Sequence, residues 1–288
     1  MNASAAPRRC LIAGCGDLGV RAGRKLAAAG WQVDGLRRSA TALPPPLALL
    51  RADLTDAASL RALGDTRYDA VVFTPTPDQR DADAYRAIYL DGLVNLLGAL
   101  VHRPERVVFV GSTAVYGDAD GNWQDEASPP APAAWNGELL LEAERALLDS
   151  GVARPSVLRL AGLYGPGREA LLRRARARQP CRSAPPHWTC RIHIDDAAGA
   201  IAHLLQLAQP ESHYIGIDDE PAYDCAVLAF IAEALGLDPG AYRLAAAAPL
   251  AHASGKRLSN RRLRDSGYDF AYPSFRQGYG ALCAGSMA

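Results

Sequence analysis

Cys10-Leu-Ile-Ala-Gly14-Cys-Gly16-Asp-Leu-Gly19 is the stretch of sequence that decides the fold. A short apolar run meets a G-x-G-x-x-G pattern, which by itself occurs often by chance. From Leu18 onward, apolar residues recur at helical spacing up to Gly30, namely Leu18, Ala22, Leu26 and Ala29. Such spacing after a short apolar run predicts a strand, a tight turn and a helix. The glycines therefore lie between a predicted strand and a predicted helix, and this position makes a chance match less probable than the pattern alone would.

The three glycines have separate roles in a site for a dinucleotide. Gly14 can make the tight turn, Gly16 can admit a diphosphate against bare backbone, and Gly19 lets helix and strand pack closely. The helix N-terminus then offers unpaired N–H groups and a positive dipole end to the phosphates. The alternative is a glycine-rich turn without a ligand.

The end of the next predicted strand, residues 32–36, bears on which cofactor is bound. Sites for NAD place a carboxylate about 20 residues beyond the glycines, where it accepts from the ribose hydroxyls. Arg37 and Arg38 stand there instead, and a guanidinium pairs with a phosphate but cannot accept a hydrogen bond. We therefore expect NADP(H) to be favoured over NAD(H), with Asp34 in mid-strand. The alternative is that both arginines are solvated and NAD binds.

The rest of the chain continues the alternation of strands and helices. Buried strands are predicted at 47–52, 70–74, 106–111 and 156–160, separated by helices at 57–63, 85–100 and 137–150. This alternation predicts an α/β protein with a Rossmann-type, doubly wound parallel sheet. A less regular part follows, with a loop at 180–186, helices at 195–207 and 225–235, and a strand at 212–217.

The composition bears on whether the protein binds nucleic acid, metal or membrane, and on the cellular compartment in which it is expected. Thirty-one basic residues balance 31 acidic ones, so no nucleic-acid partner is implied, and the run 173–178 is interpreted as a solvated helix face. The six cysteines form no Cys-x-x-Cys pair and no His completes a zinc site, so we expect no metal and reduced thiols. Disulfides are the alternative. Residues 1–9 lack the apolar core of a signal peptide and no apolar run could span a membrane, so we expect a cytoplasmic protein without a membrane partner.

Read together, these residues and several later segments resemble the extended and atypical short-chain dehydrogenases/reductases, the NAD(P)-dependent epimerase/dehydratase family. The later segments follow the family's order along nearly the whole chain: Ala52-Asp-Leu-Thr-Asp56, Gly111-Ser-Thr-Ala-Val-Tyr-Gly117, Leu158 to Gly167 and Arg191-Ile-His-Ile-Asp-Asp196. Residues 256–260 and 272–275 also resemble the tail of a compact bacterial subgroup of NAD(P)-binding oxidoreductases.

The resemblance implies a set of cofactor-binding residues and one catalytic position. The cofactor set is Gly14, Gly16, Asp17, Leu18, Gly19, Arg37, Arg38, Asp53, Leu54 and Thr74. Ser112 falls on the family's catalytic Ser/Thr position at the carboxyl end of a central strand, where its hydroxyl would hold a substrate oxygen. The alternative is a strand-end hydroxyl that caps the backbone. Tyr116 and Tyr164 rank below it as packing aromatics, and His193 is interpreted as a satisfied buried histidine.

The resemblance also implies an organisation in two lobes. Residues 1–164 would form the NAD(P)-binding domain and 165–288 a smaller substrate lobe, of which about 192–217 return to the first domain. The family often forms homodimers through helices corresponding to 85–100 and 137–150. An apolar stripe could serve such a dimer or the core, and it comprises Leu140, Leu141, Leu147 and Leu148. The partner implied is a small molecule, with nucleotide sugars one candidate class.

The family's Tyr-x-x-x-Lys pair is missing. In that pair the ammonium, one helical turn away, lowers the pKa of the phenol so that it can move a proton. Here Asn136 and Leu140 occupy the two positions, and neither can titrate. No shift of alignment restores the pair, because neither Lys25 nor Lys256 has a tyrosine four residues before it. Loss of a positioned acid/base commonly lowers rates about 10²–10⁴-fold.

Two functions remain open at this point. The first is an oxidoreductase or epimerase/dehydratase-like enzyme whose acid/base comes from Glu138, Tyr116, Tyr85 or the substrate. The second is a non-catalytic NADP-binding redox sensor or scaffold. The empty tyrosine and lysine positions favour the second, while Ser112 on an intact strand end favours the first. We favour the enzyme, with Ser112, Tyr116 and Glu138 as candidate catalytic residues.

Overall fold

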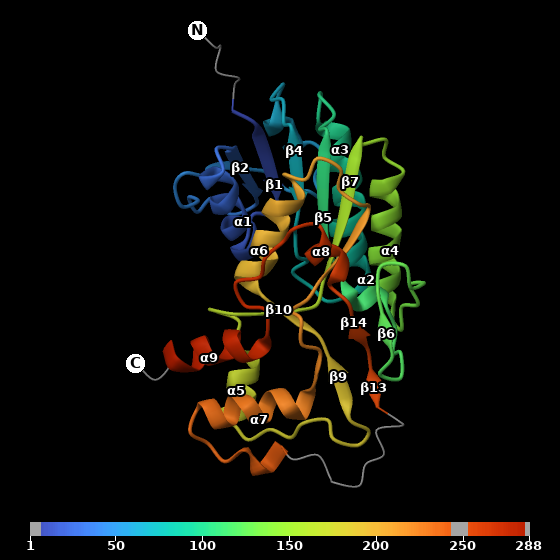
Figure 1. The fold of residues 1–288 in the computed structure, drawn as a ribbon. Coiled ribbons are helices and arrows are strands. Elements are labelled where there is room, and N and C mark those ends of the chain that lie inside the picture. Colours follow the sequence, from blue (N-terminus) through green and yellow to red (C-terminus); the bar gives the residue numbers. More distant parts are fainter. Residues whose placement is uncertain (1–6, 243–252, 286–288) are drawn as a thin grey trace. The chain divides into compact units, whose positions relative to one another are not determined.

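A seven-stranded parallel sheet forms the centre of the fold, as the sequence predicts (Figure 1). The computed structural model describes residues 7–242 and 253–285. The strands are ordered β11-β7-β5-β4-β1-β2-β3 across the sheet. Their bounds are β1 Arg9–Ala13, β2 Gln32–Arg37, β3 Ala48–Arg51, β4 Ala70–Phe73, β5 Arg106–Ser112, β7 Arg154–Leu160 and β11 His213–Gly216.

The direction of winding changes between β1 and β4. From β1 the chain steps outward through β2 to β3, and from β4 it steps the other way through β5 and β7 to β11. Leu11 in β1 therefore lies opposite both Asp34 in β2 and Val71 in β4. In open α/β sheets, ligands bind at the carboxyl ends of the strands at this switch point. The glycine turn after β1 stands at that place.

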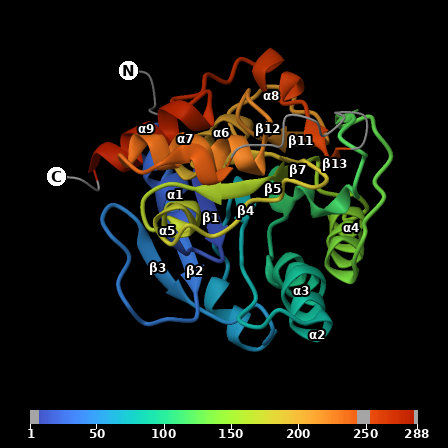
Figure 2. The same cartoon turned by 90° about the horizontal axis from the view of Figure 1, so that it is seen from below.

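Helices cover both faces of the sheet. Helix α1 (Asp17–Ala28) lies on one side, and α2 (Ala82–Tyr85), α3 (Gly92–Ala99) and α4 (Trp135–Leu148) lie together on the other (Figure 2). Helix α1 buries residues at the predicted spacing, namely Leu18, Gly19, Ala22, Gly23 and Leu26. Helix α6 (Ile194–Leu204) confirms the helix predicted at 195–207, but it begins one residue earlier and ends three residues earlier.

Two predicted helices differ in detail from the structure. The expected helix 85–100 is divided by a π-helical turn, η2 (Arg86–Asp91), between α2 and α3. The expected helix 57–63 is a 3₁₀ turn, η1 (Ser59–Leu63). The Ser59 hydroxyl donates to the backbone carbonyls of Asp53 and Asp56 just before this turn. Such side-chain-to-backbone bonds compete with a regular helix start.

Contacts divide the chain into two compact units. Unit 1 comprises Met1–Val115, Ala134–Arg159 and Ala198–Tyr214, and unit 2 comprises Tyr116–Ala133, Leu160–Ala197 and Ile215–Ala288. The lobe boundaries inferred from the sequence stay a prediction. In residues 7–242 and 253–285, no helix has the length and apolar character needed to cross a membrane.

Unit 2 has its own hydrophobic core between three helices, α5 (Ala170–Arg176), α7 (Asp224–Ala234) and α9 (Phe275–Gly285). Its large core residues include Tyr164, Leu172, Leu228, Ile231, Phe275 and Tyr279. Short strands complete the unit: β6 Trp123–Gln124, β8 Gly162–Tyr164, β9 His187–Thr189, β10 Arg191–His193, β12 Ala222–Tyr223, β13 Ser254–Gly255 and β14 Arg257–Leu258.

The expectation of reduced thiols is wrong for one pair. Cys181 and Cys225 form a disulfide with a Cα–Cα distance of 5.0 Å. Beside it, the Asp224 carboxylate accepts from the backbone N–H of Arg182 and from the Arg174 guanidinium, at 3.1 Å in each case. Arg174 is thus half-buried and paired, which corrects the interpretation of the whole run 173–178 as a solvated face.

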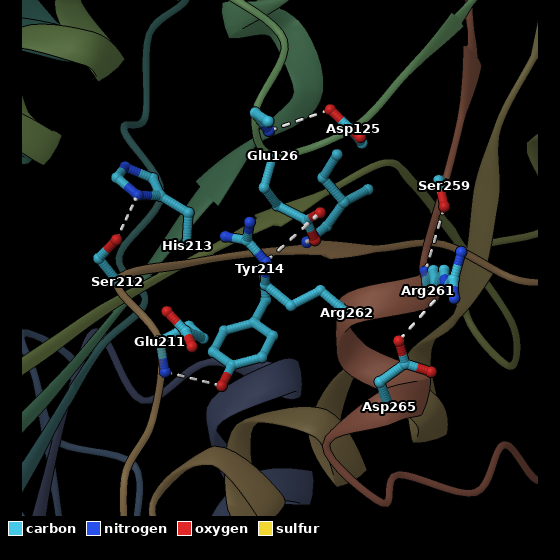
Figure 3. Close-up of polar contacts among 12 residues, drawn as sticks. Asp125, Glu126, Glu211, Ser212, His213, Tyr214, Ser259, Arg261, Arg262 and Asp265 are labelled. Atoms are coloured by element: carbon cyan, nitrogen blue, oxygen red, sulfur yellow. Dashed lines mark hydrogen bonds and ion pairs between the residues drawn. The ribbon is translucent and has the colours of Figure 1, made fainter.

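Buried polar contacts fix the segment 116–133 of unit 2. The Glu126 carboxylate accepts from the backbone N–H of Ile215 at 2.8 Å, and its other oxygen lies 3.8 Å from Nε of Arg262. Figure 3 shows the two side chains pointing toward each other, with Arg262 on α8 (Arg261–Asp265). Burial raises the pKa of Glu126, and the Arg262 charge opposes that rise.

Candidate cofactor and active site

The turn after β1 can be made only by glycine at residue 14. Gly14 has a φ of +80°, and a Cβ built on it would lie 2.3 Å from Cα of Pro75. The N–H groups of Gly14 and Cys15 both donate to the carbonyl of Leu36, at 3.0 and 2.9 Å. The turn is therefore held between the ends of β2 and β4, with its backbone closely packed.

The next glycine leaves open space at the start of α1. Gly16 is the N-cap residue, and a Cβ built on it would meet only the Gly14 carbonyl, at 4.0 Å. Within residues 7–242 and 253–285, no side chain caps this 12-residue helix. A Cβ on Gly19, in contrast, would lie 3.0 Å from Cγ2 of Ile12, so this glycine allows close packing of α1 on β1. Uncapped N–H groups at a helix N-terminus favour an anion.

The neighbouring cofactor candidates stand at the ends of β1 and β4. Asp17 is half-exposed and pairs with Arg21 at 2.9 Å, while Leu18 is buried in α1. Thr74 directly follows β4, and its N–H donates to the carbonyl of Ala13 at 2.9 Å. The structure thus brings residues 14–19 and Thr74 together at the switch point of the sheet.

The two arginines after β2 are held in different ways. Arg37 Nη2 donates to the backbone carbonyls of Thr41 and Ala42, so its guanidinium braces the loop that follows β2. Arg38 is exposed and pairs with the Asp78 carboxylate, Nη2 to Oδ1, at 2.7 Å. Of the two, Arg38 has the side chain that can exchange its partner for a ligand phosphate.

Sequence reasoning missed a third arginine at this edge. Arg51 ends β3, lies opposite Arg37 in the parallel register, and donates from Nε to the backbone carbonyl of Arg38 at 3.2 Å. The signal was available, because β3 follows β2 and parallel strands end at the same edge of a sheet. Asp34, as expected, lies within β2, where it accepts from Arg9 and from the Tyr68 hydroxyl.

The acidic turn after β3 is internally bonded. One oxygen of Asp53, Oδ1, accepts from the N–H and hydroxyl of Thr55, at 2.9 and 2.8 Å. Leu54 is buried, and its carbonyl accepts from Asn95 of α3 at 3.0 Å. The turn is therefore rigid, and Oδ2 of Asp53 makes no hydrogen bond within the described residues.

Ser112 ends β5 and directly precedes a single 3₁₀ turn, η3 (Thr113–Val115). Its Oγ accepts from the backbone N–H of Ala114 at 3.1 Å. The hydroxyl thus caps the backbone, which was the alternative interpretation, yet its own proton stays available for a substrate oxygen because only the lone pair is used.

Helix α4 carries the positions where the family has its tyrosine and lysine. Leu140 is buried in the core with 3% of its surface exposed, whereas Asn136 is half-buried at the start of the helix. Glu138, the candidate acid on the same helix, is exposed. No titratable group of α4 replaces the missing pair at its own positions.

Tyr116 and His193, both in unit 2, are engaged by the protein. Tyr116 is buried and its hydroxyl donates to the carbonyl of Asp125 at 3.0 Å, so its phenol proton is committed. The Lys256 ammonium donates to the Tyr116 carbonyl. Nδ1 of buried His193 accepts from the N–H of Asp195 at 3.2 Å, and the ring lies 3.8 Å from that of Tyr272, as a satisfied buried histidine should. Tyr164 likewise packs in the core, 4.3 Å from the ring of Tyr279.

Comparison with known proteins shows what this arrangement is similar to. A sequence profile of the NAD dependent epimerase/dehydratase family matches residues 10–216. Protein YeeZ of Escherichia coli (strain K12) is 32% identical over 280 residues, covering 92% of this chain and 97% of that protein. The dTDP-6-deoxy-L-talose 4-dehydrogenase (NAD(P)(+)) of Kitasatospora kifunensis is 33% identical over 212 residues, 70% of this chain and 63% of that enzyme.

A solved structure of a similar protein points to the same family as the sequence comparisons. A provisionally assigned NAD-dependent epimerase/dehydratase from Methylobacillus flagellatus has a TM-score of 0.83 and 38% identity, with 98% of this chain and 100% of that chain covered. The glycine turn, the strand end at Ser112 and the sheet order all lie within the matched region. The chain therefore belongs to the NAD dependent epimerase/dehydratase family.

Proposed function

We propose that the chain binds NADP(H) at the glycine turn and acts as an oxidoreductase or epimerase/dehydratase-type enzyme on a small molecule. The observation that carries the proposal is the open space at Gly16, beside the uncapped N-terminus of α1. A diphosphate fits there because, in the described part of the chain, no side chain fills the space and none caps the first-turn N–H groups. Bound there, the nicotinamide cofactor would supply hydride chemistry.

Arg38 and Arg51 support NADP(H) over NAD(H). Both guanidinium groups stand at the edge where β2 and β3 end, and the only carboxylate within β2, Asp34, is occupied by Arg9 and Tyr68. A 2′-phosphate would take the place of Asp78 on Arg38 in a charge-assisted bond. Arg37 would act indirectly, by holding the loop 38–42 in place.

The substrate side of the proposal rests on Ser112 and on one relative. The Ser112 proton would be donated to a substrate oxygen at the carboxyl end of β5. The Kitasatospora kifunensis relative is named for a dTDP-sugar, which supports a nucleotide sugar as the first class of small molecule to test.

Calorimetry with NADPH and NADH tests the cofactor site. Gly16→Ala should stay folded, because its Cβ meets nothing closer than 4.0 Å and only the modest N-cap preference of glycine is lost, yet it should bind NADPH at least about tenfold more weakly. Gly98→Ala, in α3 with nothing within 4 Å of its Cβ, is the matched control and should bind normally. A folded wild-type protein that gives no heat with either nucleotide would remove the proposal.

A non-catalytic NADP-binding sensor is the second candidate, and the burial of Leu140 at the lysine position favours it. The two functions are separated by NADPH oxidation against a panel of carbonyl compounds and nucleotide sugars. Turnover above the background rate supports the enzyme, whereas tight cofactor binding without turnover of any compound supports the sensor.

A further inference from the structure

We propose that Tyr85 supplies the proton donor that Asn136 and Leu140 cannot. The inference rests on the proposed function and concerns residues of unit 1 alone. Tyr85 is the last residue of α2 and directly precedes the π-helical turn Arg86–Asp91. Such turns are rare and recur at functional sites, because they displace side chains from regular helical positions.

The ring of Tyr85 lies against the start of α4. Its centroid is 5.0 Å from that of Trp135, with the rings edge to face at 84°. Trp135 is the first residue of α4 and directly precedes Asn136, which stands at the family's tyrosine position. The Tyr85 ring is therefore anchored at the start of α4, against the residue that precedes the family's tyrosine position.

An ion pair fixes this arrangement. Arg86, the residue after Tyr85, makes two hydrogen bonds to the Glu142 carboxylate of α4, at 3.1 and 2.8 Å. A two-point contact between a guanidinium and a carboxylate sets orientation as well as distance. Together with the ring contact on Trp135, it holds α2 on α4, so the Tyr85 phenol is positioned in advance.

The hydroxyl of Tyr85 is available. It makes no hydrogen bond to any residue in the described parts of the chain, and the side chain is half-exposed. The Tyr116 hydroxyl, in contrast, donates to the Asp125 carbonyl, and that of Tyr68 donates to Asp34. Glu138 is exposed on α4 and has no such anchoring contact with any residue that the structure describes. Tyr85 alone among the candidates from the sequence combines a free acid group with a fixed position.

Tyr89 is the nearest competitor and gives a matched control. Its ring is 5.3 Å from that of Tyr85 and 6.2 Å from that of Phe109 in β5. Burial, followed by the neighbouring Tyr85, raises the pKa of Tyr89 to about 12. A phenol that holds its proton so firmly is a poor acid near neutral pH.

The chemistry balances with the cofactor already proposed. The Tyr85 phenol would donate its proton to the carbonyl oxygen of the substrate, and the bound cofactor would supply the hydride to the carbonyl carbon. The substrate would leave as an alcohol, and the phenolate would recover a proton from water. The reverse direction uses the phenolate as a base.

Nuclear magnetic resonance of tyrosine labelled with ¹³C at Cζ tests the placement without any substrate. The resonance missing from Tyr85→Phe identifies this residue. With NADP⁺ bound, whose nicotinamide is positively charged, the Tyr85 Cζ resonance should lie at a different chemical shift from that with NADPH bound, because a nearby charge polarises the ring. Tyr89→Phe should leave this difference in place.

The outcomes separate this inference from the proposed function. If calorimetry shows cofactor binding but the Tyr85 Cζ resonance is the same with both nucleotides, Tyr85 is not the donor and the cofactor assignment stands. If no cofactor binds, both fall. For any carbonyl compound of the panel that is reduced, Tyr85→Phe should lower kcat about 10²–10⁴-fold, with KM and the NADPH Kd within about twofold. Retention of the wild-type kcat by Tyr85→Phe would overturn the inference.

Discussion

Glu144 of α4 and Arg159 of β7 form a buried ion pair, with Oε2 and Nη2 2.7 Å apart and side chains 2% and 3% exposed. A second bond joins Arg159 Nε to Glu144 Oε1 at 3.1 Å. A Cβ on Gly111, the residue before Ser112, would lie 3.3 Å from Oε1 of Glu144. The pair therefore ties α4 to β7 beneath the strand end that carries Ser112.

Arg159→Leu should cost about 3–5 kcal/mol of unfolding free energy, because it leaves the buried Glu144 carboxylate without its guanidinium and with only the His213 ring nearby, whose Nε2 lies 3.9 Å from Oε2. The double variant Glu144→Leu/Arg159→Leu should recover most of that loss, since no charge is then buried. Urea unfolding of wild type, both single variants and the double variant measures this. A double variant no more stable than Arg159→Leu would contradict it.

The loss of unfolding free energy caused by Arg159→Leu should itself depend on pH, and it should be larger at high pH. Burial already raises the pKa of Glu144, and the Arg159 charge opposes that rise. Without Arg159 the folded-state pKa rises further above the unfolded value, so the folded protein holds a proton that the unfolded chain has released. The penalty of Arg159→Leu should therefore be smaller at pH 5 than at pH 8, as urea unfolding at the two values would show.

Asp218 of unit 2 is a second buried acid with a pH signature. Burial raises its pKa to about 8 against the opposing charge of Arg191, and its Oδ2 has no hydrogen-bond partner among the described residues. Between the unfolded pKa near 4 and this value, the folded state holds an extra proton, so stability is lost as pH rises.

Asp218→Asn removes that titration. Relative to wild type, it should gain more than about 1 kcal/mol of unfolding free energy between pH 5 and pH 8. Asp65→Asn, at an exposed position, serves as control and should show no such change. Parallel pH dependence of wild type and Asp218→Asn in urea unfolding would show that Asp218 does not titrate in this range.

The disulfide between Cys181 and Cys225 can be counted directly. Thiol titration in denaturant without reductant should find four thiols per chain, those of Cys10, Cys15, Cys190 and Cys283, and six after reduction. The crosslink closes a loop across a sequence separation of 44, so reduction should lower stability by about 2–4 kcal/mol. Six thiols before reduction would mean that the pair is open.

Much of unit 1 could be predicted from local sequence signals. The apolar runs that became β1, β4 and β5 are buried on both faces, and a continuous apolar run is the pattern of such strands. The glycine turn after β1 could also be predicted, because each of its glycines meets a local requirement of backbone conformation or packing. Asp34 could be placed in mid-strand from its distance to the end of β2.

The missed features depend on contacts between residues far apart in sequence or on loop conformation. Nothing near Cys181 indicates that the loop 180–186 brings it to the start of α7. The sequence also does not show that the loop after β2 folds back, so that Nη2 of Arg37 donates to the carbonyls of residues 41 and 42. The commitment of the Tyr116 hydroxyl to Asp125 likewise follows from the path of the segment 116–133.

Substitutions of Arg38 and Arg37 should therefore affect NADPH and NADH binding in different ways. Arg38→Ala removes a guanidinium that can take the 2′-phosphate, so NADPH should bind about 10–100-fold more weakly while NADH binding changes less than about twofold. Arg37→Ala removes the brace of the loop and should lower thermal stability, with NADPH and NADH affected alike. Arg24→Ala, exposed on α1, is the control that changes neither.

Asp78→Asn should change NADPH affinity in the opposite direction to Arg38→Ala, by strengthening binding. Asp78 is the present partner of Arg38, and its carboxylate would repel a 2′-phosphate and compete with it for the guanidinium. The amide keeps the shape of the side chain but removes the charge, so NADPH should bind severalfold more tightly and NADH should be unaffected. Calorimetry at low and high salt checks the cause, since the gain should shrink as ions screen the charges. Equal gains for both nucleotides would place the 2′-phosphate away from Arg38, because only NADPH carries the group that Asp78 would repel.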